Sequence, residues 1–200
     1  SVNLGWKLAQ VVKGASTGDL LDTYHSEQQP VAARVLRNTM AQVALLGRLD
    51  DRKAALRTVF AELLAMEEPR RGFGAAMSGL DIHYALGAGH PLIGRRMPDL
   101  DLEARGATRR LTSFLHEGRA VLLDLGIGGR PDVAPWADRL QLVEAAPVAS
   151  WEIPVVGAIP PAAGVLVRPD GHVAWVEGAN DETLQSSLTR WLGDPAKVAG

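Results

Sequence analysis

Histidine is the residue type in this sequence with the widest capacity for chemistry, because its imidazole can bind a metal or transfer a proton near neutral pH. No two of the five histidines have the short spacing that places two ligands on one metal ion; they are His25, His83, His90, His116 and His172. His25 and Glu27 are two residues apart, which on a helix points them away from each other. We therefore expect no metal site, and histidines that lie on the surface or bond to other groups.

The sequence also lacks thiols, a dinucleotide-binding loop and a recognisable catalytic motif. The chain contains no cysteine, which excludes disulfides, thiolate metal sites and thiol redox chemistry. The stretch Gly126-Ile127-Gly128-Gly129 has the wrong spacing for a dinucleotide-binding loop, and no strong helix follows it. Since no nucleophile, base and orienting acid form a recognisable motif either, we assign no catalytic, cofactor-binding or metal-ligating residue.

Several residues that could contact a ligand have stronger structural interpretations. Asn3 is expected to pack against or cap a helix. The tryptophans are expected to anchor the core rather than stack on a cofactor, namely Trp6, Trp175 and Trp191. Two arginine pairs are expected to be solvated or paired with nearby acids, namely Arg95-Arg96 and Arg109-Arg110 with Asp99 and Asp101.

The composition is that of an ordinary globular protein, with 46% hydrophobic and 22% charged residues and a net charge of −2. Near-neutral charge gives no reason to expect nucleic acid or an anionic membrane as a partner. The longest apolar runs, such as Ala120–Leu123, are too short to span a bilayer. With no secretion signal at the N-terminus, we expect a cytoplasmic protein.

Apolar residues at helical spacing predict that the first part of the chain is helical. Leu4, Leu8, Val11 and Val12 share one face of the first predicted helix, which Gly14 ends. Ser16 or Thr17 caps a short second helix, which Pro30 breaks or restarts. Further helices are predicted up to Gly47, over 56–64 and over 70–80, before a glycine- and proline-rich stretch over 84–101 that suits a linker.

Strand and helix signals alternate after this stretch. Buried strands are predicted over 119–125 and 140–145, with a helix over 133–138 between them. Segments 164–167 and 172–176 flank Arg168-Pro169-Asp170-Gly171, which predicts a hairpin with a type I turn and a glycine bulge. A final helix, capped by Asn180, has a buried stripe formed by Leu184, Leu188, Trp191 and Leu192.

This order of elements resembles a thioredoxin-like domain, although Gly126-Ile127-Gly128-Gly129-Arg130 stands where thioredoxins have their cysteine pair. The predicted fold class is therefore α+β: an N-terminal helical segment over residues 1–90, followed by a thioredoxin-like α/β domain over 95–200 that lacks the CxxC pair. Such a domain cannot be redox-active through thiols. We expect the loss of His172 to cost little stability.

Five motifs, in the same order along the chain, resemble the para-hydroxybenzoate-hydroxylase-like family of FAD-dependent aromatic-ring hydroxylases, particularly those acting on polyketides. In the second motif Gln28 stands where the family usually has arginine. The motifs are Val2-Asn3-Leu4-Gly5-Trp6-Lys7-Leu8; Tyr24 with Glu27 and Pro30-Val31-Ala32; Met77-Ser78-Gly79-Leu80-Asp81-Ile82 with Tyr84; Gly94-Arg95-Arg96-Met97-Pro98-Asp99; and Val167-Arg168-Pro169-Asp170-Gly171 with Val173-Ala174-Trp175.

The resemblance implies an enzyme in which NADPH reduces FAD and a flavin hydroperoxide then transfers OH to an aromatic ring. The family's flavin-binding elements precede the position of Ser1, so we expect the C-terminal part of such an enzyme, inactive by itself. The resemblance places Met77-Ser78-Gly79-Leu80 near the substrate cavity, although close helix packing over Gly79 explains this segment equally well. The alternative is a stand-alone structural or dimerisation module with a redox-inactive thioredoxin-like fold.

Partners are expected because some apolar side chains of the helical part would otherwise lie in water. Leu4, Trp6, Leu8 and Met77 are the clearest cases. Either a homo-oligomer or the missing N-terminal flavin domain would cover them.

The first prediction concerns FAD. The isolated chain should bind FAD weakly at best and should not oxidise NADPH, because it lacks the backbone N–H groups at helix starts that hold a pyrophosphate. A titration followed by flavin fluorescence measures the binding. Stoichiometric binding at sub-micromolar concentration would contradict the prediction.

Overall fold

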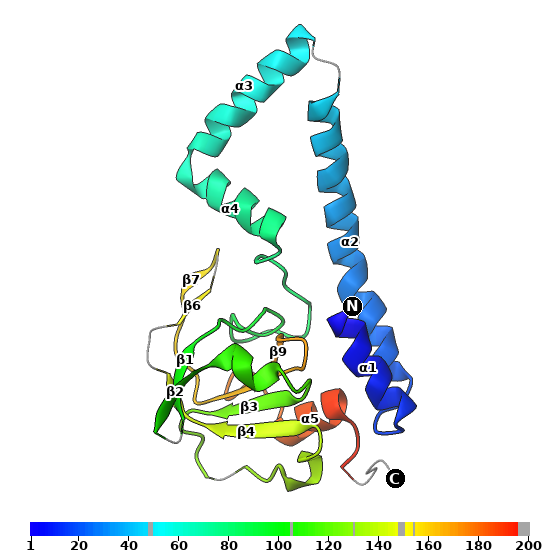
Figure 1. The fold of residues 1–200 in the computed structure, drawn as a ribbon, viewed down its shortest axis with the longest axis vertical. Helices are drawn as coiled ribbons and strands as arrows, with labels where there is room; N and C mark the ends of the chain where they lie inside the picture. The colour runs from blue at the N-terminus through cyan, green and yellow to red at the C-terminus, as the bar shows by residue number, and fades with distance from the viewer. Residues whose placement is uncertain (48–49, 105, 130, 148–150, 154, 196–200) are drawn as a thin grey trace.

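Helices from the first part of the chain and a mixed sheet from the last part make up the computed structural model (Figure 1). The structure describes residues 1–47, 50–104, 106–129, 131–147, 151–153 and 155–195. Helix α1 (Val2–Val12) and the first half of α2 (Asp19–Leu46) lie beside the sheet. The second half of α2 projects away from it with α3 (Asp51–Ala65) and α4 (Glu67–Ser78); residues 35–78 are called the helical arm below.

Helix α2 runs through Pro30, so the prediction of a break there is wrong. Proline removes one hydrogen bond of the helix ladder, but the helix is held on both sides of it because Leu20 and Val31 pack against the core. The predicted cap is also wrong, since the N-cap residue is Gly18 and no side chain caps the helix.

The main sheet has the strand order β4-β3-β8-β9. Strand β3 (Ala120–Asp124) is parallel to β4 (Leu140–Glu144) and antiparallel to β8 (Gly164–Val167). Strand β8 is antiparallel to β9 (Val173–Val176), with a register shift at Leu166/Val167. A parallel pair beside an antiparallel hairpin is the arrangement of a thioredoxin-like sheet, which confirms the predicted fold class.

The turn between β8 and β9 forms as predicted. The Gly171 amide donates to the Arg168 carbonyl at 2.8 Å, and the Arg168 amide donates to the His172 carbonyl at 2.9 Å. Gly171 has φ +80, a left-handed conformation that glycine adopts without steric cost. The turn fixes the hairpin register and thereby the positions of the Arg168 and Asp170 side chains.

Two connections differ from the predicted thioredoxin-like order. The helix predicted over 133–138 is only a 3-10 turn, η2 (Ala134–Trp136), in which the Ala137 amide donates to the Ala134 carbonyl at 3.2 Å. Between β4 and β8 the chain forms β5 (Ala146–Pro147), β6 (Glu152–Ile153) and β7 (Gly157–Ala158). A second sheet has the order β2-β1-β5, with β1 (Asp101–Ala104) and β2 (Ala107–Arg110), and η1 (Leu111–Leu115) follows it.

The final helix, α5 (Leu184–Leu192), packs on β9 as predicted. Leu188, Trp191 and Leu192 are fully buried in the same core as the sheet. The predicted cap is wrong: Thr183, not Asn180, accepts the cap bond, from the Ser186 amide at 3.2 Å. Asn180 instead accepts from the Glu182 amide before the helix begins.

The glycine- and proline-rich stretch over 84–101 is not a linker. Leu92, Ile93 and Met97 are buried. The Gly94 amide donates to the Val173 carbonyl and the Val173 amide donates to the Arg95 carbonyl, at 2.8 and 2.9 Å. This segment therefore extends the sheet edge next to β9, because its apolar side chains have a core to enter.

The buried face of α1 is polar and lies opposite the apolar face that Leu4, Leu8 and Val12 share. Asn3, Trp6, Lys7 and Gln10 are buried, whereas Leu4 and Leu8 are exposed. Met77 is also exposed, so Trp6 alone of the four side chains expected to lack partners is covered. The polar residues can be buried because other side chains bond to them.

Among the described residues, no helix combines the length and apolar character needed to cross a membrane.

The second prediction tests the packing of α5. Leu188→Ala should lower the free energy of unfolding by about 2–5 kcal/mol, because the side chain is fully buried and its loss leaves a cavity. Thr189→Ala, at the next and exposed position, is the control and should have little effect. Urea denaturation measures both; equal effects would show that α5 is not held by this stripe.

Candidate functional site: a buried charged cluster

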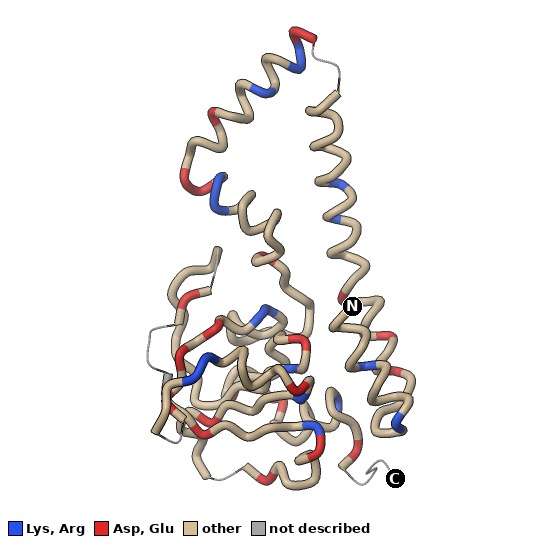
Figure 2. The backbone as a smooth tube through the Cα atoms, in the orientation of Figure 1, with Lys and Arg blue, Asp and Glu red and all other residues tan. Residues whose placement is uncertain are grey.

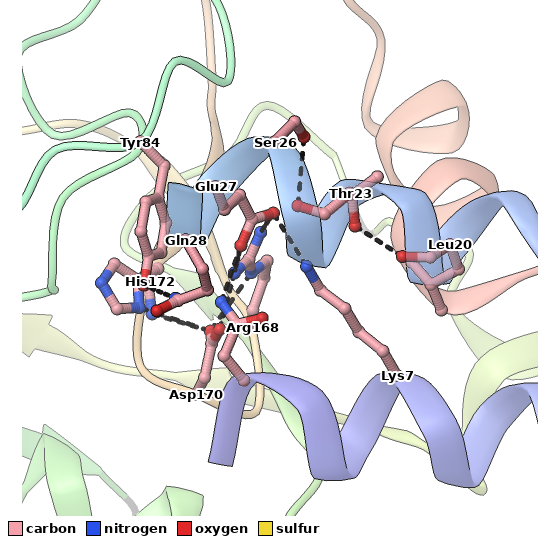
Figure 3. A network of polar contacts seen from close by, with 11 residues as sticks. Lys7, Leu20, Thr23, Ser26, Glu27, Gln28, Tyr84, Arg168, Asp170 and His172 are labelled. Atoms are coloured by element: carbon pink, nitrogen blue, oxygen red, sulfur yellow. Dashed lines mark hydrogen bonds and ion pairs between the residues drawn. The ribbon is translucent and has the colours of Figure 1, made fainter. Parts of the chain in front are cut away.

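Four ionised side chains and one histidine meet inside the protein, where α1 and α2 reach the β8–β9 turn (Figure 3). We call Lys7, Glu27, Arg168, Asp170 and His172 the charged cluster. The side chains of Lys7 and Arg168 are 0% exposed, and those of Glu27 and Asp170 are 3% exposed. Burial of this extent is rare for ionised groups and requires each charge to have partners.

Glu27 is the acceptor at the centre of the cluster. Arg168 Nη1 and Nη2 donate to its two carboxylate oxygens at 2.7 and 2.9 Å, a bidentate pair. Lys7 Nζ lies 3.0 Å from Glu27 Oε1, and Asn3 Nδ2 donates to Oε2 at 2.7 Å. Glu27 therefore joins both N-terminal helices to the hairpin.

Arg168 is held on its other side by the turn that follows it. Its Nε and Nη2 donate to the Asp170 carboxylate at 3.1 and 2.6 Å. The guanidinium carbon lies 4.6 Å from the ring centre of Trp191 and 5.4 Å from that of Trp6. Aromatic faces attract a guanidinium, so these rings stabilise the charge where carboxylates do not reach.

His172 and Gln28 extend the cluster toward Tyr84. The His172 and Tyr84 ring centres are 4.4 Å apart, and the His172 amide donates to Asp170 Oδ1 at 3.3 Å. Gln28 Nε2 donates to the Tyr84 hydroxyl at 2.7 Å. Gln28, the residue that replaces the expected arginine, thus makes a neutral hydrogen bond. Because His172 is buried and stacked, the expectation that its loss costs little is revised.

The pKa values follow from burial and from the partners. Burial alone would raise the pKa of Glu27, but hydrogen bonds and charge from Arg168, with bonds from Asn3 and Lys7, hold it below the ordinary value. Burial opposes ionisation of Asp170 too, yet His172 and Arg168 keep its pKa far below the usual range. Burial lowers the pKa of Lys7, and the nearby charge of Arg168 adds to this effect. The carboxylates are therefore stabilised in their ionised forms, whereas the ammonium is disfavoured.

Comparison with known proteins connects this geometry to a family. A family model described as "Aromatic-ring hydroxylase, C-terminal" matches residues 90–195. The chain belongs to the aromatic-ring hydroxylase family. A second model, described as an FAD-binding domain, matches residues 1–39. Lys7 and Glu27 lie in the second match, and Arg168 and Asp170 lie in the first.

Curated relatives of this chain include monooxygenases named for tetracycline precursors and for rifampicin. The 12-dehydrotetracycline 5-monooxygenase/anhydrotetracycline 6-monooxygenase of Streptomyces rimosus is 42% identical over 200 residues, covering 98% of this chain and 39% of the relative. The rifampicin monooxygenase of Streptomyces venezuelae is 42% identical over 198 residues, covering 99% and 37%. The solved structure of OxyS anhydrotetracycline hydroxylase from Streptomyces rimosus is similar with a TM-score of 0.86 and 40% identity, over 97% of this chain and 39% of that chain.

The described residues of this hydroxylase chain do not by themselves fit FAD. The cavity that reaches the start of α1 has a volume of about 640 Å³ and is lined by Val2, Met97, Leu111, Ile153 and the β8–β9 turn. It contains no glycine-rich strand-to-helix loop whose amides could hold a pyrophosphate. The charged cluster is also unsuited to hold the cofactor, because its carboxylates and its guanidinium bond to one another.

The structure does not bring the histidines singled out in the sequence together. His25 and His116 are exposed, His83 and His90 contact the carbonyls of Ile93 and Pro160, and only His172 joins the cluster. Among the described residues no group of three or more possible ligands could hold a metal ion.

The structural interpretations of Asn3 and the tryptophans are confirmed, since Asn3 bonds to Glu27 and the tryptophans are buried in the core: Trp6, Trp175 and Trp191. Arg110 pairs with Asp99 and Asp101, as expected.

In the structure the segment Met77-Ser78-Gly79-Leu80 lies at the end of α4. Gly79 ends α4 in a left-handed conformation, with φ +72. Met77 is exposed, and Gln42 Nε2 lies 3.3 Å from its sulfur. The segment therefore terminates a helix of the helical arm, and the Ile82 side chain packs closely over Gly79, where an added Cβ would lie 3.3 Å from Ile82 Cδ1. Its position near a substrate cavity stays a prediction.

Reasoning from the sequence missed the charged cluster. Glu27 and Arg168 are separated by 141 positions, and no local pattern connects them. One signal was available: Lys7 interrupts an apolar helix directly after Trp6, and Arg168 directly follows an apolar strand. A charge that must share an apolar environment needs a buried partner.

The third prediction tests the cluster by substitution. Glu27→Gln should lower the free energy of unfolding by about 3–5 kcal/mol, because it leaves Lys7 and one side of Arg168 without a counter-charge. Lys7→Met should cost less, because burial already disfavours the charged form of Lys7. Glu62→Gln, at an exposed position of α3, is the matched control for urea denaturation. A loss from Glu27→Gln no larger than that of the control would contradict the account.

The fourth prediction concerns pH. Glu27 and Asp170 have lower pKa values in the folded state, so their stabilisation is present above the ordinary carboxylate pKa of about 4 and is lost as pH falls below it. Stability should therefore fall more steeply between about pH 5 and pH 3 in the wild type than in Glu27→Gln. Urea midpoints across this range measure the difference. Parallel curves would show that Glu27 does not contribute to the pH dependence of stability.

Proposed function

We propose that this chain forms the C-terminal part of a flavin-dependent monooxygenase that hydroxylates an aromatic or polyketide-type substrate. Its membership of the aromatic-ring hydroxylase family supports this proposal. So does its similarity to monooxygenases named for tetracycline precursors and for rifampicin. The chain spans only 39% and 37% of the lengths of these two relatives, so the activity belongs to a longer protein.

The observation that supports the role of this part most directly is the position of the charged cluster. It joins helices matched by the FAD-binding model to a hairpin matched by the C-terminal model. Arg168 is the bidentate partner of Glu27 from α2, and Glu27 in turn pairs with Lys7 from α1, so the burial of this carboxylate depends on the hairpin. The thioredoxin-like region is therefore proposed to brace the flavin-binding helices, with no redox chemistry of its own.

The division of the chain is part of the same proposal. We place a helical segment over residues 1–90 and a thioredoxin-like region over 95–200. The start of the C-terminal family match at residue 90 supports this division. Contacts across the boundary are extensive, since Trp6 and Leu20 share one hydrophobic core with the sheet.

The cofactors of the complete enzyme are proposed to be FAD and, as reductant, NADPH. The FAD-binding family match over residues 1–39 supports the flavin. The overall reaction would insert one oxygen atom of O₂ into an aromatic C–H bond, with NADPH supplying two electrons and the second oxygen atom leaving as water. The hard chemistry of this reaction would belong to the flavin, and the protein would bind and orient it.

The fifth prediction tests this function in the longer protein that contains the chain. It should retain a yellow flavin after desalting, oxidise NADPH faster when a phenolic polyketide such as anhydrotetracycline is added, and give a product with one additional oxygen atom. Absorbance and mass spectrometry measure these results, with ¹⁸O₂ identifying the source of the oxygen. A protein that carries no flavin and leaves the substrate unchanged would contradict the proposal.

A further inference from the structure

Helix α1 exposes its apolar side to solvent. Val2, Leu4, Leu8 and Val12 are 63%, 37%, 46% and 77% exposed, and we call these four residues the α1 apolar face. The opposite side of the same helix is buried against the charged cluster and α5: Asn3 and Lys7 contact Glu27, and Gln10 donates to the Trp191 carbonyl at 3.3 Å.

This arrangement reverses the usual one, in which a surface helix buries its apolar stripe and exposes its polar side. The polar side is stabilised inside by ion pairs and hydrogen bonds, so the helix cannot rotate its leucines inward without breaking the contacts of Lys7 and Asn3 with Glu27. The helix is therefore fixed with its apolar side outward. A contiguous exposed apolar patch of this kind indicates a surface that binds another protein part.

The helical arm also exposes apolar side chains to solvent. Helix α2 has no charged residue from Asn38 to its last residue, Leu46. Figure 2 shows this upper part of the helix in tan, without blue or red. Leu36, Met40, Val43 and Leu46 are more than 60% exposed. None of the residues of α3 is buried, although Leu56, Val59, Phe60 and Leu63 are apolar. These helices lack the cover that their composition requires.

We propose that the α1 apolar face is the surface on which the remainder of the flavin-binding domain packs; this inference rests on the proposed function. The FAD-binding model matches residues 1–39, which form only α1, the following turn and part of α2. Two helices cannot enclose a dinucleotide, which needs a sheet with a glycine-rich turn and its own core. The rest of such a domain must contact these helices, and their other side is already occupied by the β8–β9 hairpin and α5.

A second copy of the chain is the competing occupant. The flavin-binding domain is favoured because the α1 apolar face lies wholly within the FAD-binding match. The chain also covers only 39% of the tetracycline-precursor relative, so about three-fifths of that relative's length lies outside it, which is ample material for such a domain. The face therefore belongs to the interior of the flavin-binding domain, and the charged cluster determines which side of α1 points into it.

The experiment compares one substitution in two settings. Leu8→Gln is introduced into the 200-residue chain and into the flavin-containing holoenzyme that includes it. In the chain alone it should leave the thermal midpoint unchanged, because Leu8 faces water. In the holoenzyme it should lower the midpoint and reduce the flavin retained after desalting severalfold. Leu4→Gln is a second variant with the same expectation, and Lys13→Gln, exposed at the end of α1 but outside this face, should change neither quantity.

Each other outcome overturns the proposal. A Leu8→Gln holoenzyme with the wild-type midpoint and flavin content would do so while leaving the proposed function intact. Wild-type chains that form a dimer in light scattering, and become monomers with Leu8→Gln, would assign the face to a second copy. Unfolding of the 200-residue variant would show that Leu8 is already packed. A wild-type holoenzyme without flavin would remove both this proposal and the proposed function.

Discussion

The guanidinium group of Arg168 lies between two carboxylates, that of Glu27 from helix α2 and that of Asp170 from its own turn. Four of its five N–H groups donate to these acids, and the Trp191 and Trp6 rings cover its faces. Moving these charges out of water costs several kcal/mol per ion, and only this set of partners offsets that cost. The hairpin, α1 and α2 are consequently stable together and destabilised by the loss of any one partner.

This dependence supports the proposed role of a thioredoxin-like fold that has no cysteines. Its sheet and final helix provide a rigid, dry environment, and the β8–β9 turn presents Arg168 and Asp170 from it. In the proposed function the fold acts through its geometry, as an anchor for helices that the FAD-binding model matches. An ion pair is suited to this task because it also specifies orientation: α1 can dock with Asn3 and Lys7 inward and in no other rotation. Its leucines then face away from the thioredoxin-like region.

Sequence reasoning succeeded where the determining contacts are local. The turn over Arg168-Pro169-Asp170-Gly171 depends on four neighbouring residues, and the stripe with Leu188 depends on one helix, so both could be predicted. It failed where distant residues decide. Pro30 lies inside α2 because packing on either side holds the helix, and the buried face of α1 is polar because Glu27 and Arg168 approach from other elements. The glycine- and proline-rich stretch over 84–101 was predicted as a linker since its backbone partner, β9, is far along the chain. The candidate site is formed by such long-range contacts, and the sequence indicated its residues without indicating that they meet.

The central claim is that Glu27 and Arg168 act as one unit that joins the two family-matched segments. A double-mutant cycle with Glu27→Gln, Arg168→Met and the double variant, followed by urea denaturation, tests it most directly. The account predicts a coupling free energy of about 1–3 kcal/mol, since either single change already removes the bidentate Glu27–Arg168 interaction. Losses that simply add, with a coupling near zero, would contradict it.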